Sequence, residues 1–139
     1  MRIALLALLL LLTSQAHADP LTAALLAQLR QGGFILYFRH SETPNYIDPH
    51  EGNFDDCGQQ RNLSKDGRTQ ARAIGKAFRD LDIPLGLVRS SPFCRSADTA
   101  RLAFGRVEKD MSLLSNGEDD EPGENERIAH LKNIMKIPP

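Results

Sequence analysis

The sequence predicts an α/β fold with a mainly parallel sheet. Residues 34–38 are consecutive apolar residues with a preference for strands, and their lack of alternation indicates a strand buried on both faces. Helical and strand-like segments follow one another in the order helix, strand, helix, strand, helix, helix. That order is typical of an α/β layer fold, in which helices connect parallel strands.

Apolar residues recur at helical spacing in several segments. We expect helices at residues 21–30, about 65–81, 94–104 and about 125–135. Gly32, Gly33 and Gly105 suit the C-terminal ends of helices, and Ser64 suits an N-terminal cap. The residues expected to face inward are, in the second helix, Ala71, Ile74, Phe78 and Leu81, and in the last helix Ile128, Leu131 and Met135.

The segments between the helices are expected to be one further strand and two loops. Residues 85–89 form the strand, which Pro84 separates from the preceding helix. Residues 41–63 contain proline, glycine and many polar residues, so they indicate a long loop, and loops of that length tend to be functional. Residues 107–126 are polar and acidic and are expected to be a surface loop.

The N-terminus has the pattern of a signal peptide. Arg2 supplies the charged start, residues 4–12 are an almost unbroken apolar run, and Ala16 and Ala18 offer small residues to a signal peptidase. The run is too short for the roughly 20 residues of a membrane-spanning helix, although an uncleaved anchor is the alternative. We expect residues 1–18 to be removed and residues 19–139 to form one partial domain, exported to the periplasm or secreted and not bound to a membrane after cleavage.

Charge and cysteine content narrow the function. The chain has 17 Lys and Arg against 18 Asp and Glu and no long basic run, so nothing favours a nucleic acid as partner. Cys57 and Cys94 are an even number in an exported chain, which favours a disulfide, with two free thiols as the alternative. Their spacing does not suit a zinc site, and we expect neither a metal nor a cofactor.

Arg39 and His40 follow the first expected strand, at the end of a sheet where α/β proteins bind ligands. A neutral imidazole is a nucleophile near pH 7, and a guanidinium matches phosphate oxygens in shape and charge. After the second expected strand, Arg95 lies at the start of a helix, whose dipole adds to its charge. The two arginines would hold one phosphate while His40 attacks phosphorus. The alternative is that His40 is a structural residue and that the arginines are solvated.

Three motifs in this region resemble those of the histidine phosphatase superfamily, also called phosphoglycerate mutase-like. Residues 39–43 read Arg-His-Ser-Glu-Thr and resemble its Arg-His-Gly-Glu-Thr motif. Residues 63–71 resemble its Leu-Thr-x-x-Gly-x-x-Gln-Ala segment, and residues 90–100 resemble its Ser-Ser-Pro-x-x-Arg-x-x-x-Thr-Ala segment. The motifs occur in family order, so the resemblance implies a three-layer phosphoglycerate mutase-like fold.

The resemblance also implies roles for individual residues. His40 would carry the phosphoryl group, and Arg39 and Arg95 would bind the substrate phosphate. Thr43 matches a small hydroxyl position near the phosphate, with a capping or turn hydroxyl as the alternative. Glu121 or a neighbouring glutamate would be the general acid, although some branches of the family use an aspartate elsewhere and an acidic run is usually a solvated loop.

Two departures from the family pattern affect the expected activity. Ser41 stands where the family usually has glycine. The family also has a second histidine after a later strand, whereas His50 and His130 lie in a loop and in an amphipathic helix and are expected at the surface. We therefore expect the C-terminal strands to be missing from a truncated chain.

The sequence thus predicts a phosphatase that hydrolyses small phosphate monoesters through a phosphohistidine intermediate, with impaired activity. The alternative is a catalytically inactive remnant or a phosphate-binding module of the same fold. Neither the substrate nor the oligomeric state follows from the sequence.

Overall fold

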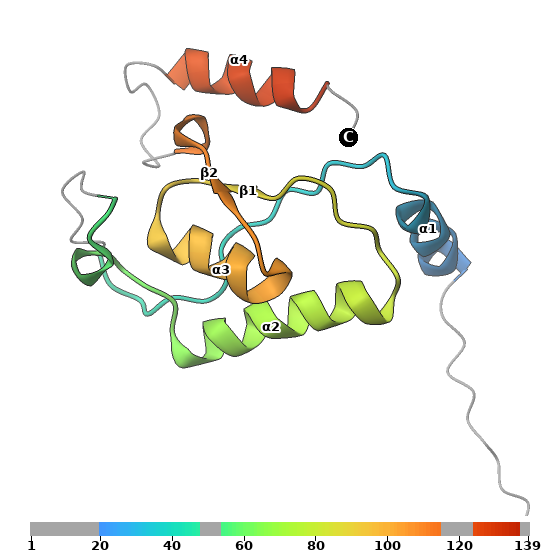
Figure 1. Cartoon of the computed structure of the whole chain (residues 1–139), viewed down its shortest axis with the longest axis horizontal. Coiled ribbons are helices and arrows are strands. Elements are labelled where there is room, and N and C mark those ends of the chain that lie inside the picture. Colours follow the sequence, from blue (N-terminus) through green and yellow to red (C-terminus); the bar gives the residue numbers. More distant parts are fainter. Residues whose placement is uncertain (1–19, 48–53, 115–123, 137–139) are drawn as a thin grey trace, which may run out of the picture.

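The computed structural model describes residues 20–47, 54–114 and 124–136 (Figure 1). The predicted signal peptide, His50 and Glu121 lie outside these residues. No helix among the described residues has the length and apolarity needed to cross a membrane.

The four predicted helices are confirmed within one residue at each end. They are α1 (Pro20–Gln31), α2 (Lys65–Asp80), α3 (Cys94–Phe104) and α4 (Glu124–Ile134), and two short 3₁₀ helices, η1 (Cys57–Gln59) and η2 (Met111–Leu113), lie in the connections. The predicted caps are also present. The Ser64 hydroxyl accepts the Gly67 N–H at the start of α2, and Gly105 ends α3 with a φ of 72°.

The core of the described part lies between α2 and α3, which run side by side (Figure 1). Ala71 and Ala97 are fully buried, and the rings of Phe78 and Phe104 meet edge to face at 5.1 Å. A Cβ at Gly75 would lie 1.9 Å from the Ala103 carbonyl oxygen. Only glycine therefore allows the two helices to approach this closely, which the apolar pattern did not predict.

Some predicted inward-facing residues are exposed. Ala71 and Phe78 are buried as predicted, but Leu81 is 38% exposed because it follows the last residue of α2, which extends past the end of α3 (Figure 1). On α4, Ile128 and Met135 are 39% and 51% exposed. Helix α4 contacts η2, and Leu131, the third predicted inward-facing residue, is half-buried.

The described sheet is a parallel pair of two-residue strands. Strand β1 (Arg89–Ser90) pairs with β2 (Glu108–Lys109), and together with α3 they form a βαβ unit, as an α/β fold requires. The parallel direction is confirmed, but β1 begins later than predicted. The prediction of a loop from residue 107 is wrong where β2 lies, because two polar residues carry no apolar pattern.

The prediction of a buried strand at residues 34–38 is wrong in this structure. The segment has no strand assignment, and its side chains are 43% to 81% exposed. A strand is stabilised by hydrogen bonds to a neighbour and is buried by layers on both faces. Within the described residues, the strands pair with each other and not with residues 34–38.

Candidate active site

His40 follows the extended apolar segment and is half-buried. Its Nδ1 lies 2.7 Å from the carbonyl oxygen of Ser41. A carbonyl only accepts hydrogen bonds, so this contact assigns the proton of a neutral ring to Nδ1. Nε2 then carries the lone pair that a nucleophile needs.

The surroundings of His40 favour its neutral form. Burial lowers the pKa of His40 below its ordinary value of 6.5, and the hydrogen bond to the Ser41 carbonyl opposes this effect. The positive charges of Arg95, Arg39 and Arg61 lower the pKa further. The imidazole is therefore unprotonated, and able to attack, at neutral pH.

The loop of residues 39–43, called the nucleophile loop after the role expected of His40, is held on one side by the start of α2. The Ser64 N–H donates to the Glu42 carbonyl at 3.1 Å, and the Ser64 hydroxyl donates to Glu42 Oε1 at 2.9 Å. The Glu42 N–H donates to Gln70 Oε1 at 3.0 Å. Glu42 therefore holds the loop by hydrogen bonds through both its backbone and its carboxylate.

Gly67 allows this close approach of α2 to the loop. A Cβ at Gly67 would lie 2.0 Å from the Glu42 carbonyl oxygen, well inside contact distance. The glycine of the second motif thus has a physical reason, because any side chain here would push the nucleophile loop and α2 apart.

Helix α3 holds the other side of the nucleophile loop. The N–H of Ser41, which is 3% exposed, donates to Thr99 Oγ1 at 3.0 Å. The Thr99 hydroxyl in turn donates to the carbonyl of Arg95 at 2.7 Å. One hydroxyl therefore joins the residue after His40 to the first turn of α3.

Arg95 is the second residue of α3, where the helix dipole is positive. Its guanidinium carbon lies 3.9 Å from the centroid of the Phe93 ring, a cation–π contact that orients the side chain. Phe93 is the N-cap of α3 and makes no side-chain capping bond. The Cys94 N–H instead donates to Gln60 Oε1 at 2.8 Å, so a distant loop caps this helix.

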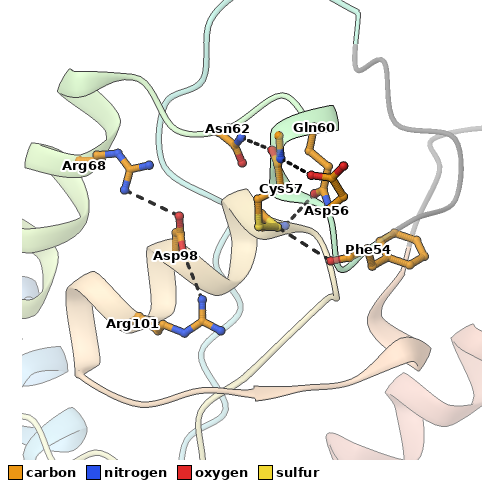
Figure 2. The surroundings of a disulfide bond; sticks show 10 residues. Phe54, Asp56, Cys57, Gln60, Asn62, Arg68, Asp98 and Arg101 are labelled. Carbon is orange, nitrogen blue, oxygen red and sulfur yellow. Dashed lines mark hydrogen bonds and ion pairs between the residues drawn. A yellow bond between two sulfur atoms is a disulfide. The ribbon is translucent and has the colours of Figure 1, made fainter.

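Cys57 and Cys94 form the predicted disulfide, with Cα atoms 5.7 Å apart. Figure 2 shows how the bond joins η1 to the start of α3, with Gln60 on the same loop. Cys94 is 2% exposed, whereas Cys57 is exposed. The disulfide and the Gln60 bond together fix the loop after the nucleophile against the helix that carries Arg95.

The structure brings together most of the residues that the sequence singled out. Arg39 and Arg95 both act electrostatically on His40, although Arg39 is exposed. Thr43 is half-buried in the nucleophile loop. Glu121 lies outside the described residues, so its predicted role as general acid stays a prediction. 

His130 lies at the surface, as predicted. Its side chain is 46% exposed on α4, and its Nε2 is 3.7 Å from the Asp110 carboxylate. Among residues 20–47, 54–114 and 124–136, no three His, Cys, Asp or Glu side chains are arranged to hold a metal ion.

Sequence reasoning missed the parts of Thr99, Gln60 and Arg61 in this site. Thr99 lies four residues after Arg95, and residues at that spacing share a helix face, so the helical pattern contained a signal for it. Gln60 lies three residues after Cys57, which the predicted disulfide brings to α3. Arg61 lies in an irregular loop, where no periodic pattern predicts the direction of a side chain.

Comparison with known families gives one match. A family model described as the histidine phosphatase superfamily (branch 1) matches residues 35–118, which is more than half of the chain. The matched region includes the nucleophile loop, α2, α3 and the disulfide. No curated protein and no solved structure matches the chain.

Proposed function

Because the chain belongs to the histidine phosphatase superfamily, we propose that it is an exported phosphatase acting on small phosphate monoesters through a phosphohistidine at His40. The observation that carries this proposal is the protonation state of the His40 imidazole. Nδ1 is bound to the Ser41 carbonyl, and the charges of Arg39 and Arg95 reach the ring, so Nε2 is both unprotonated and close to anion-binding groups.

The proposed reaction has two steps. His40 Nε2 attacks phosphorus, an N–P bond forms, and the bond between phosphorus and the ester oxygen breaks. The leaving oxygen takes a proton from a general acid, for which Glu121 or a neighbouring glutamate is the candidate. Water then attacks phosphorus and gives a proton back to the carboxylate that acted as the acid, the N–P bond breaks, phosphate leaves, and the lone pair returns to Nε2.

Arg39 and Arg95 would stabilise the charge on the phosphoryl oxygens in both steps. Phosphoryl transfer depends mainly on positioning and on electrostatic stabilisation, and two guanidinium groups supply both. Thr43 would add a hydroxyl from the nucleophile loop. The dipole of α3 acts in the same direction as Arg95, which lies in its first turn.

The disulfide supports the exported location. Disulfides persist in oxidising compartments, and Cys57–Cys94 joins two segments of the proposed site. The N-terminal sequence pattern of a signal peptide supports the same proposal.

One observation favours a second candidate, a phosphate-binding module with little or no turnover. Residues 34–38, which lead to His40, are exposed and unpaired with either described strand. Among residues 20–47, 54–114 and 124–136, the second histidine that the family resemblance implies also has no counterpart at a strand end, since His130 lies on α4. We therefore propose that turnover by this chain is slow, while phosphorylation of His40 persists.

A phosphorylation experiment tests the proposal. The protein is incubated with phosphoramidate, and acid-labile phosphate on histidine is measured together with hydrolysis of an aryl phosphate. We expect acid-labile labelling that is lost in His40→Ala and kept in His130→Ala, whose histidine lies at the surface of α4. Equal labelling of the wild type and His40→Ala would refute the role of His40. Binding of phosphate without any labelling would favour the second candidate.

A further inference from the structure

We propose that Thr99 is a positioning residue that holds the His40 imidazole and the start of α3 in a fixed relative position. Thr99 Oγ1 accepts the Ser41 N–H at 3.0 Å and donates to the Arg95 carbonyl at 2.7 Å. The proposal rests on the proposed function of His40 as the nucleophile. It adds a residue that would act on the reaction without touching the substrate.

The backbone of Ser41 connects Thr99 to the His40 imidazole. Its N–H is bound to Thr99, and its carbonyl accepts from His40 Nδ1 at 2.7 Å. Both backbone polar groups of the residue after the nucleophile are therefore used. A rotation of Ser41 would move the acceptor that holds the proton on Nδ1, so Thr99 controls the ring through this residue.

Arg95 is the second partner of the Thr99 hydroxyl. The same hydroxyl that accepts from Ser41 donates to the Arg95 carbonyl, which belongs to the residue proposed to bind phosphate. Ser41 and Thr99 are 58 residues apart in the sequence. A single oxygen atom thus fixes the distance between the nucleophile loop and the first turn of α3, on which in-line attack would depend.

Thr99 and Ser41 are 8% and 3% exposed, so bulk water is not available to replace the hydroxyl. A buried N–H without an acceptor is unfavourable, and a loop that loses its acceptor moves to find another one. Removal of the hydroxyl is therefore expected to shift the nucleophile loop as well as delete one bond.

The chain contains a matched control on α2. The Thr69 hydroxyl donates to the carbonyl four residues earlier, Lys65, at 3.2 Å, as Thr99 does to Arg95. Thr69 is exposed and lies on α2, whereas Thr99 is buried on α3. Thr69→Val and Thr99→Val therefore remove the same kind of local helix contact, but only Thr99→Val removes the link to the nucleophile loop.

The experiment compares Thr99→Val, Thr99→Ser and Thr69→Val by two measurements. Nitrogen-15 NMR of the labelled imidazole, assigned with His40→Ala, reports which ring nitrogen of His40 carries the proton. The rate of labelling by phosphoramidate reports phosphorylation. We expect Thr99→Val to lower the Nδ1–H fraction and to slow labelling between about tenfold and a hundredfold, the range expected for a misplaced reacting group. Thr99→Ser, which keeps the hydroxyl, should have the wild-type tautomer and labelling rate, and Thr69→Val should also leave both unchanged.

A folded Thr99→Val protein with the wild-type tautomer and labelling rate would overturn the proposal, as would a Thr99→Ser protein that lacks them. If Thr99→Val does not fold, amide exchange of Ser41 in the wild type and in Thr99→Ser decides. Slow exchange supports the bond to Thr99, and exchange at the rate of an unprotected amide overturns it. If the wild type is not labelled at all, the phosphatase proposal fails, but the tautomer measurement still decides whether Thr99 positions His40.

Discussion

Two glycine substitutions on α2 separate the stability of the helix pair from the geometry of the nucleophile loop. Gly67→Ala would place a Cβ 2.0 Å from the Glu42 carbonyl oxygen, and Gly75→Ala would place one 1.9 Å from the Ala103 carbonyl oxygen. Both clashes involve backbone atoms on the partner segment. They are nearly equal in severity, but only the first involves the residue two positions after His40.

The distances set the expected magnitudes. Cβ contacts below 3.0 Å are essentially never observed, so each substitution requires a shift of at least about 1 Å. Overpacking of this kind costs about 1 to 3 kcal/mol, and the better helix preference of alanine offsets about 1 kcal/mol of this cost. We therefore expect each variant to lose up to about 2 kcal/mol of unfolding free energy.

The effects on phosphorylation should differ. A shift of about 1 Å in a reacting group reduces the rate by up to about a hundredfold, so Gly67→Ala should lower phosphoramidate labelling of His40 by roughly that factor. Gly75→Ala presses on Ala103 in the last turn of α3, eight residues after Arg95, whereas the first turn of α3 stays tied to the loop by the Cys57–Cys94 disulfide. Labelling should therefore stay within about threefold of the wild type, an order-of-magnitude expectation for a shift at the far end of the helix.

Urea denaturation followed by circular dichroism gives the stabilities, and labelling is measured well below the unfolding midpoint of each variant. Wild-type labelling of Gly67→Ala would refute the proposed contact between α2 and the nucleophile loop. An equal loss of labelling in both glycine variants would show that the rate follows helix packing in general, and would refute the specific role of Gly67.

Two further predictions concern pH and redox state. Because burial and the neighbouring arginines lower the pKa of His40, labelling should remain constant at neutral pH and decrease only as the pH falls through a value below 6.5; a midpoint above 6.5 in the rate profile would contradict this. Because the pKa of His40 is lower in the folded than in the unfolded state, the stabilisation is complete above the unfolded-state pKa and is lost as the pH falls toward the folded-state pKa. His40→Ala should therefore flatten this part of the profile of unfolding free energy against pH. Replacement of Cys57 and Cys94 by serine removes the cross-link between residues 37 positions apart, so the unfolded chain gains entropy. The chain-entropy model then predicts that the unfolding free energy falls by about 4 kcal/mol. Urea midpoints of the serine variant, and of the wild type with and without reductant, measure this loss; identical midpoints would show that the disulfide contributes nothing.

The helices and their ends could be predicted from the sequence because their causes are local. Apolar spacing, the Ser64 cap and the positive φ of Gly105 act within a few residues, and all of them appear in the structure. The disulfide was predicted from an even number of cysteines in a chain expected to be exported, and it forms. The family motifs were also recognisable, because they are short runs of residues at fixed spacing.

The sheet could not be predicted in the same way. Residues 34–38 have the composition of a buried strand, yet whether such a segment pairs and is buried depends on neighbours from other parts of the chain. Conversely, β2 has no apolar residue, and it pairs because Val88 and Ser90 offer carbonyl groups to the N–H groups of Glu108 and Asp110. Strand pairing is a non-local property, and its partners are not encoded in the segment itself.

The sequence by itself determined that His40 follows an apolar segment, that Gly67 and Arg95 lie near the starts of two later helices, and that these motifs are those of the histidine phosphatase superfamily. Only the tertiary structure decided which groups hold the imidazole. The contacts of Ser41 with Thr99 and of Cys94 with Gln60 join residues 58 and 34 positions apart. Such contacts depend on the relative placement of whole helices and loops, which the residues next to His40 do not set.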